Sequence, residues 1–502
     1  MANTLFDALF APLKGRQTAL LMLPSGAVIS GDAFLSLVAR QAHALRAAGV
    51  SPGDRVAVQV AKTPEALAVY GATIALGAVF LPLNTAYTPA EIDYFLGNAT
   101  PRVFLCDASR RAELAPLAQA QGAVVLTLNA DGSGSLTEAA AGQPEAITPE
   151  SRGPGDLAAL LYTSGTTGRS KGAMLSHGNL LSNAEVLARL WRFTERDVLL
   201  HALPIFHTHG LFVASNVSLL TGGAMIFQPG FELEAALEAL PRATALMGVP
   251  TFYTRLLDDD RFTRDLVAHM RLFVSGSAPL LAETHQAFEA RTSHRILERY
   301  GMTETNMNSS NPYEGERRAG TVGFALPGVE IRITAEGQEV APGEVGMIEV
   351  RGPNVFQGYW QMPEKTAEEL RPDGFFLTGD LGRFDVDGYL QIVGRQKDLI
   401  ITGGYNVYPK EVELLLDEMP GVLESAVIGL PHPDFGEAVF AVLVPARGAR
   451  PDPAAVLAGL AGQLARYKQP KAAVVVEGLP RNTMGKVQKN LLRETYRGWF
   501  GG

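Results

Sequence analysis

The chain has 502 residues, 47% of them hydrophobic, so it is too long for one core and rich enough in apolar side chains to build two or more. Acidic residues outnumber basic ones by 52 to 43 without any basic block, which argues against nucleic acid or an anionic membrane as the main partner. The one cysteine, Cys106, cannot form an internal disulfide, residues 1–17 lack the composition of a targeting segment, and no apolar run could span a bilayer. We therefore expect a cytoplasmic protein that acts on small molecules.

Short apolar runs alternate with longer amphipathic segments in the first part of the chain. In order they are 55–61, 64–76, 79–83, 89–99 and 102–106. This alternation predicts parallel sheets covered by helices, with ligands bound at the carboxyl ends of the strands. Residues 128–156 are rich in Ala, Gly, Pro and acidic residues and show little periodicity, so a surface connection is expected there.

A loop dense in glycine and hydroxyl residues follows the apolar run 157–161. It reads Tyr-Thr-Ser-Gly-Thr-Thr-Gly-Arg-Ser-Lys-Gly and ends at Gly172. Glycines let backbone N–H groups approach an oxyanion, hydroxyls add donors, and Lys171 offers a charge to a polyphosphate. It is not a P-loop, because that motif ends in Gly-Lys-Ser/Thr. We predict a phosphate-binding loop, with a solvated linker as the alternative.

Two histidines flank a threonine a little further along the chain. Residues 176–190 predict a helix with Ser176 or Asn179 near its start, and 198–204 predict a buried strand. The segment 204–210 after it reads Pro-Ile-Phe-His-Thr-His-Gly. Such spacing could bind zinc, but no cysteine or acidic third ligand lies nearby. We favour the wall of a pocket, with polar groups satisfied locally at a strand end as the alternative.

Strands at 224–228, 245–248 and 271–275 lead to two further segments of interest. The first, Ser-Gly-Ser-Ala-Pro-Leu at 275–280, is a tight small-residue turn against which a nucleobase or ribose could rest. The second contains Arg-Tyr-Gly-Met-Thr-Glu-Thr and ends near 307. It offers an aromatic face for adenine, a hydroxyl for phosphate and a hard carboxylate for the Mg²⁺ that accompanies ATP. A plain surface carboxylate is the alternative.

The pattern changes from about residue 320. Short strands and turns predict a hairpin-rich sub-domain at about 320–396. After it, 399–502 alternate strand and helix and form a unit of the size of a small domain. Near its end, residues 480–489 read Pro-Arg-Asn-Thr-Met-Gly-Lys-Val-Gln-Lys, so Lys486 follows a glycine in a loop.

Three of these segments resemble the signature motifs of the adenylate-forming enzymes, namely the loop before Gly172, the segment around Glu304 and the loop around Lys486. That superfamily includes acyl-CoA synthetases, peptide-synthetase adenylation domains and beetle luciferases. The resemblance covers essentially the full length. It implies an α/β fold with a large N-terminal domain (1–396) of helix-covered sheets and a β-rich sub-domain, and a small mobile α+β domain (399–502).

The resemblance also implies ATP, Mg²⁺ and coenzyme A as cofactors and an acyl-adenylate intermediate, with AMP and pyrophosphate released. Catalysis is expected from Lys486, Glu304 and Thr163, and metal binding from Thr167 and Glu304. The residues expected to bind ATP or AMP are Thr163, Ser164, Gly165, Thr166, Thr167, Gly168, Lys171, Ser277, Ala278, Arg299, Tyr300, Gly301, Thr303, Asp380 and Arg395.

The small domain is expected to rotate between the two half-reactions. Lys397 and Asp398 would form the hinge. Rotation would withdraw Lys486 and bring Gly403, Gly404 and Tyr405 to line a tunnel for CoA. Two glycines suit a backbone that passes close to a slim ligand. For Arg395, a surface ion pair is the alternative to a nucleotide contact.

The residues expected to line the acyl pocket are His207, Thr208, Arg255, Arg299 and Met307. Fatty or aromatic acids would gain nothing from two buried guanidinium groups, whereas Arg255 and Arg299 could hold the distal carboxylate of a short dicarboxylic acid. These motifs look most like those of malonyl-CoA synthetases, which implies malonate, with methylmalonate as a further candidate. A ligase for another short acid and a module that loads a carrier protein are the alternatives, and a solvated helix residue is the alternative for Arg255.

Overall fold

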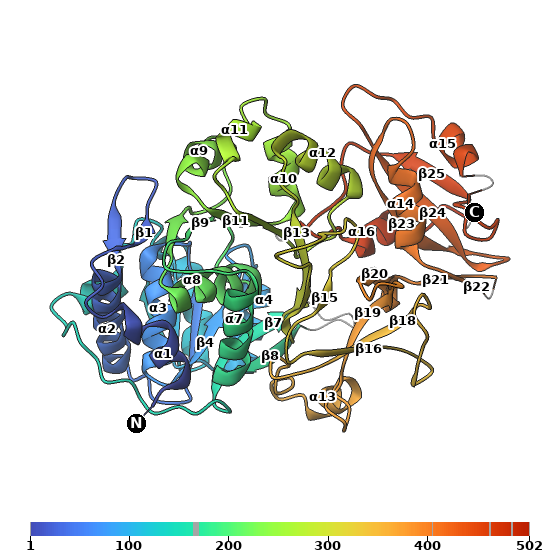
Figure 1. The fold of residues 1–502 in the computed structure, drawn as a ribbon. Coiled ribbons are helices and arrows are strands. Elements are labelled where there is room, and N and C mark those ends of the chain that lie inside the picture. Colours follow the sequence, from blue (N-terminus) through green and yellow to red (C-terminus); the bar gives the residue numbers. More distant parts are fainter. Residues whose placement is uncertain (1, 164–169, 404, 461–462, 483–484, 501–502) are drawn as a thin grey trace. The chain divides into compact units, whose positions relative to one another are not determined.

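The computed structural model describes residues 2–163, 170–403, 405–460, 463–482 and 485–500. By its internal contacts the chain forms two compact units. The first comprises Met1–Ile331 and Val350–Phe376, and the second Arg332–Glu349 and Leu377–Gly502. Both combine sheets with helices (Figure 1), which confirms the predicted α/β class. The predicted division into a domain of residues 1–396, a hinge at Lys397 and Asp398, and a mobile domain of residues 399–502 stays a prediction.

A six-stranded sheet of the first unit carries the predicted phosphate loop. Its strands, from edge to edge, are β6 (Val124–Thr127), β5 (Val103–Cys106), β3 (Arg55–Gln59), β4 (Val79–Pro82), β7 (Leu157–Thr163) and β8 (Lys171–Ser176). All neighbours run parallel except β8, which is antiparallel to β7. The carboxyl end of β7 therefore lies at the edge of the sheet where ligands are expected.

A nine-stranded sheet forms the other layer of strands in this unit. Its order is β15 (Phe324–Ala325), β14 (Asn306–Ser310), β13 (Leu297–Met302), β12 (Leu272–Ser275), β11 (Ala245–Gly248), β9 (Val198–His201), β10 (Ala224–Phe227), β1 (Ala19–Met22) and β2 (Val28–Ser30). The strands from β13 to β1 run parallel, and β2, β14 and β15 are antiparallel to their neighbours.

Helices and short helical turns fill the connections of the first unit. The α-helices are α1 (Thr4–Leu9), α2 (Gly31–Ala47), α3 (Pro64–Ala75), α4 (Pro89–Ala99), α5 (Arg111–Ala120), α6 (Ser135–Ala140), α7 (His177–Leu190), α8 (Asn216–Thr221), α9 (Leu233–Ala239), α10 (Pro250–Leu257), α11 (Arg264–Val267), α12 (Ala282–Thr292) and α13 (Pro363–Glu369). The shorter turns are η1 (Ala11–Leu13), η2 (Ala108–Arg110), the π-helix η3 (His209–Ser215) and η4 (Leu240–Arg242).

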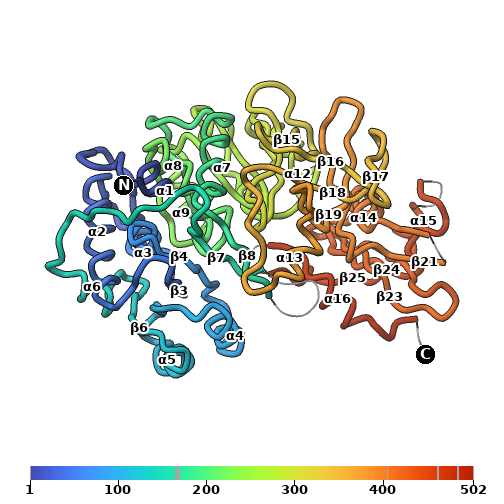
Figure 2. The backbone as a smooth tube through the Cα atoms, turned by 90° about the horizontal axis from the view of Figure 1, so that it is seen from below, coloured from blue at the N-terminus to red at the C-terminus, as the bar shows by residue number. Residues whose placement is uncertain are grey.

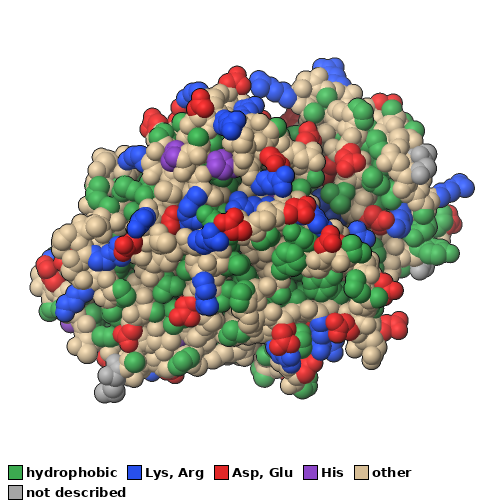
Figure 3. All heavy atoms as spheres, viewed as in Figure 1, with side chains coloured by type: hydrophobic (Ala, Val, Ile, Leu, Met, Phe, Trp, Pro, Cys, Tyr) green, Lys and Arg blue, Asp and Glu red, His purple; other side chains and the backbone are tan. Residues whose placement is uncertain are grey.

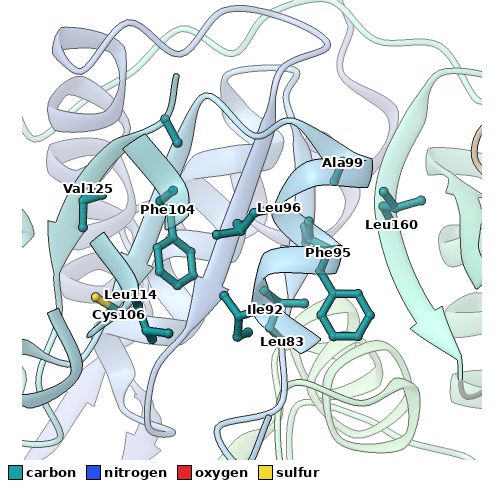
Figure 4. Close-up of a cluster of buried hydrophobic side chains, with 14 of the residues drawn as sticks. Leu83, Ile92, Phe95, Leu96, Ala99, Phe104, Cys106, Leu114, Val125 and Leu160 are labelled. Atoms are coloured by element: carbon teal, nitrogen blue, oxygen red, sulfur yellow. The ribbon is translucent and has the colours of Figure 1, made fainter. Parts of the chain in front are cut away.

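Side chains on the two faces of the six-stranded sheet pack against different helices. On one face, Leu81 and Phe104 belong to the same buried cluster as Phe95 of α4 (Figure 4). On the other, the ring of Phe80 lies 5.3 Å from that of Tyr70 in α3. Because successive residues of a strand point to opposite faces, the sheet is covered on both sides. Figure 2 shows α4 and α5 on one side of β3 and β4 and α3 on the other.

Local capping residues fix where several helices begin. Ser176 precedes α7, and its side chain accepts from the N–H of Asn179 while the Asn179 side chain accepts from the Ser176 N–H, which is a capping box. Thr88 and Glu91 form the same arrangement before α4. The predicted helix 176–190 is thereby confirmed, including the role of Ser176.

One local prediction was wrong. The connection 128–156 contains α6, on which Leu136 and Ala140 are buried and which packs against α2. Two apolar side chains four residues apart lie on the same face of a helix, so this short element can be buried in spite of its polar composition.

The second unit contains two small sheets. The first has the order β17 (Gln338–Glu339), β16 (Glu330–Ala335), β18 (Gly346–Arg351), β19 (Phe376–Phe384) and β20 (Leu390–Arg395). The second consists of β22 (Tyr405–Val407), β21 (Ile400–Thr402), β24 (Gly436–Pro445), β23 (Val422–His432) and β25 (Ala472–Val475), of which β25 pairs with β24. The helical elements are η5 (Gln396–Asp398), α14 (Pro409–Asp417), α15 (Pro453–Gly459) and α16 (Lys489–Tyr496).

Two further observations concern the apolar character of the helices and the charged side chains on the surface. In the parts of the chain that the structure describes, no helix is both long and apolar enough to cross a membrane. On the face drawn in Figure 3, Lys and Arg side chains are interspersed with Asp and Glu side chains.

Candidate active site

Lys171 begins β8 directly opposite Thr163, the last residue of β7, so the two strands carry the ends of the predicted phosphate loop. The Lys171 side chain is largely buried, and its Nζ lies 3.0 and 3.1 Å from the two carboxylate oxygens of Glu369. Nζ also lies 4.1 Å from the ring centroid of Tyr359. The loop residues themselves, Ser164, Gly165, Thr166, Thr167 and Gly168, lie outside the described residues.

Glu304 lies buried beside the same cluster. The Tyr359 hydroxyl is 3.1 Å from Glu304 Oε1 and 2.6 Å from Glu369 Oε2, and Thr163 Oγ1 is 3.5 Å from Glu304 Oε1. Burial alone would raise the pKa of Glu369, but hydrogen bonds from Tyr359, Lys365 and Lys171 outweigh it and hold that pKa below its usual value. The structure thus gathers Thr163, Lys171 and Glu304 at one place.

This donor set fits a magnesium ion. Carboxylate and hydroxyl oxygens are the hard ligands that Mg²⁺ prefers, and Glu304 and Thr163 supply both kinds. The metal-binding role of Glu304 stays a prediction with a direct test.

Glu304→Gln is expected to raise the Mg²⁺ concentration required for half-maximal activity and to lower kcat more than it weakens nucleotide binding. A neutral amide is a poorer ligand for a hard cation, whereas contacts to the base are unaffected. Titration of the rate with Mg²⁺ checks this, with Glu364→Gln on the exposed face of α13 as the control. An unchanged Mg²⁺ dependence would remove Glu304 from the metal site.

Arg299 lies on β13 and is 4% exposed. Among the described residues, its buried Nε and Nη2 have no hydrogen-bond partner. Burial lowers the pKa of the Arg299 guanidinium to about 9, and Tyr253 opposes this shift weakly. A buried cation without an anion is costly, so this position is suited to receive a negatively charged group.

The guanidinium of Arg299 lies against the backbone of Gly276. A Cβ atom added to Gly276 would overlap Cζ, Nη1 and Nε of Arg299. Glycine at 276 therefore leaves the space in which the guanidinium is held.

Gly276→Ala is expected to displace the Arg299 guanidinium and to lower kcat/KM for the acid by roughly tenfold or more, because misplacing a binding group by about 1 Å can cost a hundredfold. The KM for ATP should change less. Gly230→Ala is the matched control, since a Cβ there meets open space. Steady-state kinetics with each substrate varied in turn would show the difference, and equal losses for both variants would contradict the assignment.

The segment with the two histidines leads into η3, which begins at His209. His209 is 1% exposed, its Nε2 has no partner among the described residues, and the Oγ1 of Thr208 is likewise buried without one. Burial lowers the pKa of His209 well below its usual value, and the charge of Arg299 lowers it further, so the ring is neutral. The His209 N–H donates to Nδ1 of His207 at 3.4 Å. Thr208, His209 and Arg299 therefore offer unsatisfied polar groups within a buried wall.

The small-residue turn after β12 contacts η3. Ser277 adopts a left-handed backbone with φ of 70°, which is uncommon for a residue other than glycine. Its Oγ lies 3.2 Å from Nδ1 of His209, while Ala278 is half-buried. The turn thus connects Ser277, which is predicted to bind the nucleotide, to His209, the neighbour in sequence of Thr208, which is predicted for the acyl pocket.

The hairpin of β13 and β14 carries Tyr300, Gly301, Thr303 and Met307. Gly301 pairs with Met307, and a Cβ on Gly301 would overlap the Met307 side chain. Met307 and Tyr300 are buried, and Thr303 is partly buried. Met307 on β14 therefore lies opposite Gly301, which is two residues after Arg299 on β13. This position is consistent with the predicted pocket wall.

Arg255 differs from Arg299 in its surroundings. It lies in the last turn of α10 and is exposed. The burial that the predicted pair of arginines requires is present at Arg299 and absent at Arg255, whose contact with substrate stays a prediction.

In the second unit, Asp380 on β19 and Arg395 on β20 are opposite each other in antiparallel register. The Arg395 Nε lies 2.9 Å from Asp380 Oδ1. The ion pair that was the alternative for Arg395 thus exists, and its partner is the residue predicted to bind the ribose. Burial, and then the charge of Arg395, lower the pKa of Lys397, and Asp398 accepts from Arg493 at 2.7 Å.

Lys486 lies in a tight loop before α16. Its backbone N–H donates to Asn482 Oδ1 at 3.0 Å, and its carbonyl accepts from the Asn482 N–H at 2.9 Å. Gly485 has a φ of 75°, which favours glycine. The residues predicted for CoA begin with Gly403, whose φ of 56° also favours glycine; Gly404 lies outside the described residues.

Tyr405, the third residue predicted for CoA, is 60% exposed, and its ring stacks on Tyr467 at 4.8 Å. Tyr467 is partly buried, so the exposed ring of Tyr405 is the one suited to contact a ligand, and its role stays a prediction.

Sequence reasoning missed Tyr359, Glu369 and Lys62. Glu369 reaches Lys171 across 198 positions of the chain, and nothing in the local pattern of either segment indicates the contact. Lys62 is buried against His201, and neither residue stands in a motif that indicates this contact.

Comparison with known proteins places the chain in a family. The model of the AMP-binding enzyme family matches residues 13–360, and that of the AMP-binding enzyme C-terminal domain matches residues 411–486. The chain belongs to the AMP-binding enzyme family, which confirms the resemblance to adenylate-forming enzymes.

Individual relatives are similar over nearly the whole length. A feruloyl-CoA synthase from Amycolatopsis sp is 38% identical over 91% of this chain and 92% of that protein. The malonate–CoA ligase of Arabidopsis thaliana is 36% identical over 89% of this chain and 79% of that protein. The crystal structure of ATP-bound MatB from Rhodopseudomonas palustris is 58% identical, covers 100% of both chains and superposes with a TM-score of 0.97.

Proposed function

We propose that the protein is an ATP- and Mg²⁺-dependent acid–CoA ligase that acts on malonate. It joins malonate to coenzyme A through an acyl-adenylate and releases AMP and pyrophosphate. The family membership and the similarity to a malonate–CoA ligase support this proposal.

The observation that carries the substrate is the buried Arg299. Its two unpartnered nitrogens lie in a wall that also contains Thr208 and His209. A bidentate carboxylate matches the fork of a guanidinium, and its charge would offset the cost of burying the cation. Malonate keeps such a carboxylate at one end while the other end reacts.

In the first half-reaction, one carboxylate oxygen of malonate attacks the α-phosphorus of ATP, the bond to the bridging oxygen breaks, and pyrophosphate leaves. Lys171 and the loop before it would hold the β and γ phosphates, and Lys486 would neutralise charge that builds on the equatorial oxygens. Glu304 would hold the Mg²⁺, which supplies positive charge to the phosphates. The protein thus positions and neutralises.

In the second half-reaction, the thiol of CoA loses its proton and its sulfur attacks the acyl carbon, with AMP as the leaving group. Rotation about Lys397 and Asp398 would withdraw Lys486 and bring Gly403 and Tyr405 to the thiol. No covalent intermediate on the enzyme is required, because the adenylate already provides a good leaving group.

An aromatic acid such as ferulate is the second candidate, because a feruloyl-CoA synthase is 38% identical to the chain. An aromatic ring would leave the Arg299 guanidinium buried without an anion. We therefore favour malonate.

The test is a panel of acids assayed for CoA thioester and for AMP, each with and without CoA. We expect malonate to give the highest kcat/KM, followed by methylmalonate, with propionate and ferulate far behind. Higher efficiency with ferulate or propionate would contradict the malonate assignment, and AMP release without any thioester would point to a module that serves a carrier protein.

We also propose that the protein acts in the cytoplasm. The one cysteine, Cys106, is buried and free, as in proteins of reducing compartments. Fractionation of cells, with the activity followed in each fraction, tests this location.

A further inference from the structure

Lys62 and His201 form a buried polar pair that the proposed mechanism does not use. Lys62 is 9% and His201 0% exposed. The Lys62 Nζ lies 2.9 Å from His201 Nδ1 and donates to the His201 carbonyl at 2.7 Å. It also lies 4.3 Å from the ring centroid of Phe227, which is paired with His201 on the neighbouring strand. Lys62 follows β3 of one sheet and His201 ends β9 of the other, so the contact joins the two sheets.

The hydrogen bonds of His201 continue into η3. Its Nε2 lies 2.9 Å from the carbonyl oxygen of Gly210 and 3.0 Å from Oγ of Ser215, and Ser215 Oγ donates to the same carbonyl at 2.9 Å. Because a carbonyl can only accept, Nε2 carries the proton and Nδ1 is the acceptor for Lys62. The Gly210 carbonyl therefore sets the tautomer, and Lys62 holds the orientation of the ring through Nδ1.

This chain of contacts ends at the acyl pocket. Gly210 directly follows Thr208 and His209, whose side chains lie in the buried wall with Arg299. A π-helix such as η3 is uncommon and is frequently found at functional sites. Since Gly210 has no room for a Cβ next to the Pro204 carbonyl, the backbone at the start of η3 is tightly confined.

Stability alone gives no reason for a lysine and a histidine at these positions. Replacing a buried polar or ionic pair by apolar side chains of similar volume is often neutral or stabilising. A second-layer pair that orients a functional segment is a common reason to keep such groups.

We propose that Lys62 and His201 are positioning residues of the acyl pocket, which hold the first turn of η3 so that Thr208 and His209 face the substrate acid beside Arg299. The inference rests on the proposed function of that pocket. It implies that loss of the pair weakens use of the acid substrate selectively and leaves the ATP site unaffected.

The test compares Lys62→Met with Gln41→Met. Gln41, on α2, is also buried, and its amide atoms have no partner among the described residues, so the control removes a buried polar group of similar length that is not linked to η3. We expect Lys62→Met to raise the KM for malonate roughly tenfold to a hundredfold. The KM for ATP should stay within about twofold, and Gln41→Met should leave both KM values unchanged.

A second pair of variants keeps the proposal testable if Lys62→Met does not fold. His201→Gln can still donate near the Nε2 position, whereas His201→Leu cannot, so the Gln variant should retain a lower KM for malonate than the Leu variant. The double variant of Lys62→Met and His201→Leu should be no worse than the worse single one, because both break one chain of contacts. A lower thermal midpoint with unchanged KM for malonate in Lys62→Met, or equal KM values in the two His201 variants, would overturn the proposal.

The experiment distinguishes failure of the malonate assignment from failure of the positioning role of Lys62 and His201. If the unmutated enzyme makes no malonyl-CoA, the proposed substrate fails, and the same variants are then compared on the best acid of the panel. A selective rise of the KM for that acid over the KM for ATP would still support the positioning role.

Discussion

Lys486→Ala is expected to abolish formation of the acyl-adenylate while leaving transfer of the acyl group from a supplied acyl-adenylate to CoA largely intact. Lys486 would neutralise charge that develops on the α-phosphate as pyrophosphate leaves, and the proposed rotation would withdraw it before the second half-reaction. Removing one such group costs roughly 100- to 1000-fold in rate. The backbone of the loop is held by Asn482, so the substitution should leave the loop in place.

The measurement follows the two half-reactions separately. Exchange of labelled pyrophosphate into ATP reports adenylation, and thioester formation from a chemically prepared acyl-adenylate reports the transfer. Lys471→Ala, an exposed lysine of the same unit, serves as the control. Equal losses in both half-reactions would show that the rotation of the small domain does not separate the roles as proposed.

Arg299→Ala is expected to lower kcat/KM for malonate by about two decades, or roughly 3 kcal/mol of transition-state stabilisation, because it removes a charge-assisted bidentate contact. Propionate has no distal carboxylate and should suffer far less. The fold should tolerate the change, since the substitution removes a buried cation without a hydrogen-bond partner at Nε or Nη2 among the described residues. The ratio of efficiencies for malonate and propionate is therefore the quantity to measure.

Two further arginine variants complete this experiment. Arg295→Ala removes an exposed arginine paired with Glu289 and should leave the ratio unchanged. Arg255→Ala tests the predicted second contact, for which we expect a smaller effect than for Arg299 because the side chain is exposed and its charge is screened by water. If the ratio stays at the unmutated value in both Arg299→Ala and Arg255→Ala, neither arginine reads a second carboxylate.

Features with a local cause could be predicted from the sequence. The apolar run before the phosphate loop forms β7 (Leu157–Thr163), and Ser176 caps α7 with Asn179 because both signals lie within a few residues. Glu304 lies beside Thr163, and the resemblance had implied a catalytic role for both residues.

Features that depend on contacts between distant segments could not be predicted. Lys62 and His201 are 139 positions apart, and each alone resembles an ordinary polar residue at a strand end. The π-helix η3 has a wider turn than an α-helix. Hydrophobic patterns are read with the α-helical period of 3.6 residues, so they do not distinguish such a turn. The exposure of Arg255 was missed because an arginine near a strand end can point to the pocket or to water, and the side is set by how α10 packs.

The central claim is that Arg299 binds a second negative charge on the acid. The most direct test compares malonate with its monomethyl ester in the unmutated enzyme, because the ester keeps the three-carbon skeleton of the acid and replaces the distal charge by a neutral methyl ester. We predict that kcat/KM for malonate exceeds that for monomethyl malonate by about two decades, and that Arg299→Ala brings the two values together. Equal efficiencies for malonate and its monoester in the unmutated enzyme would contradict the account.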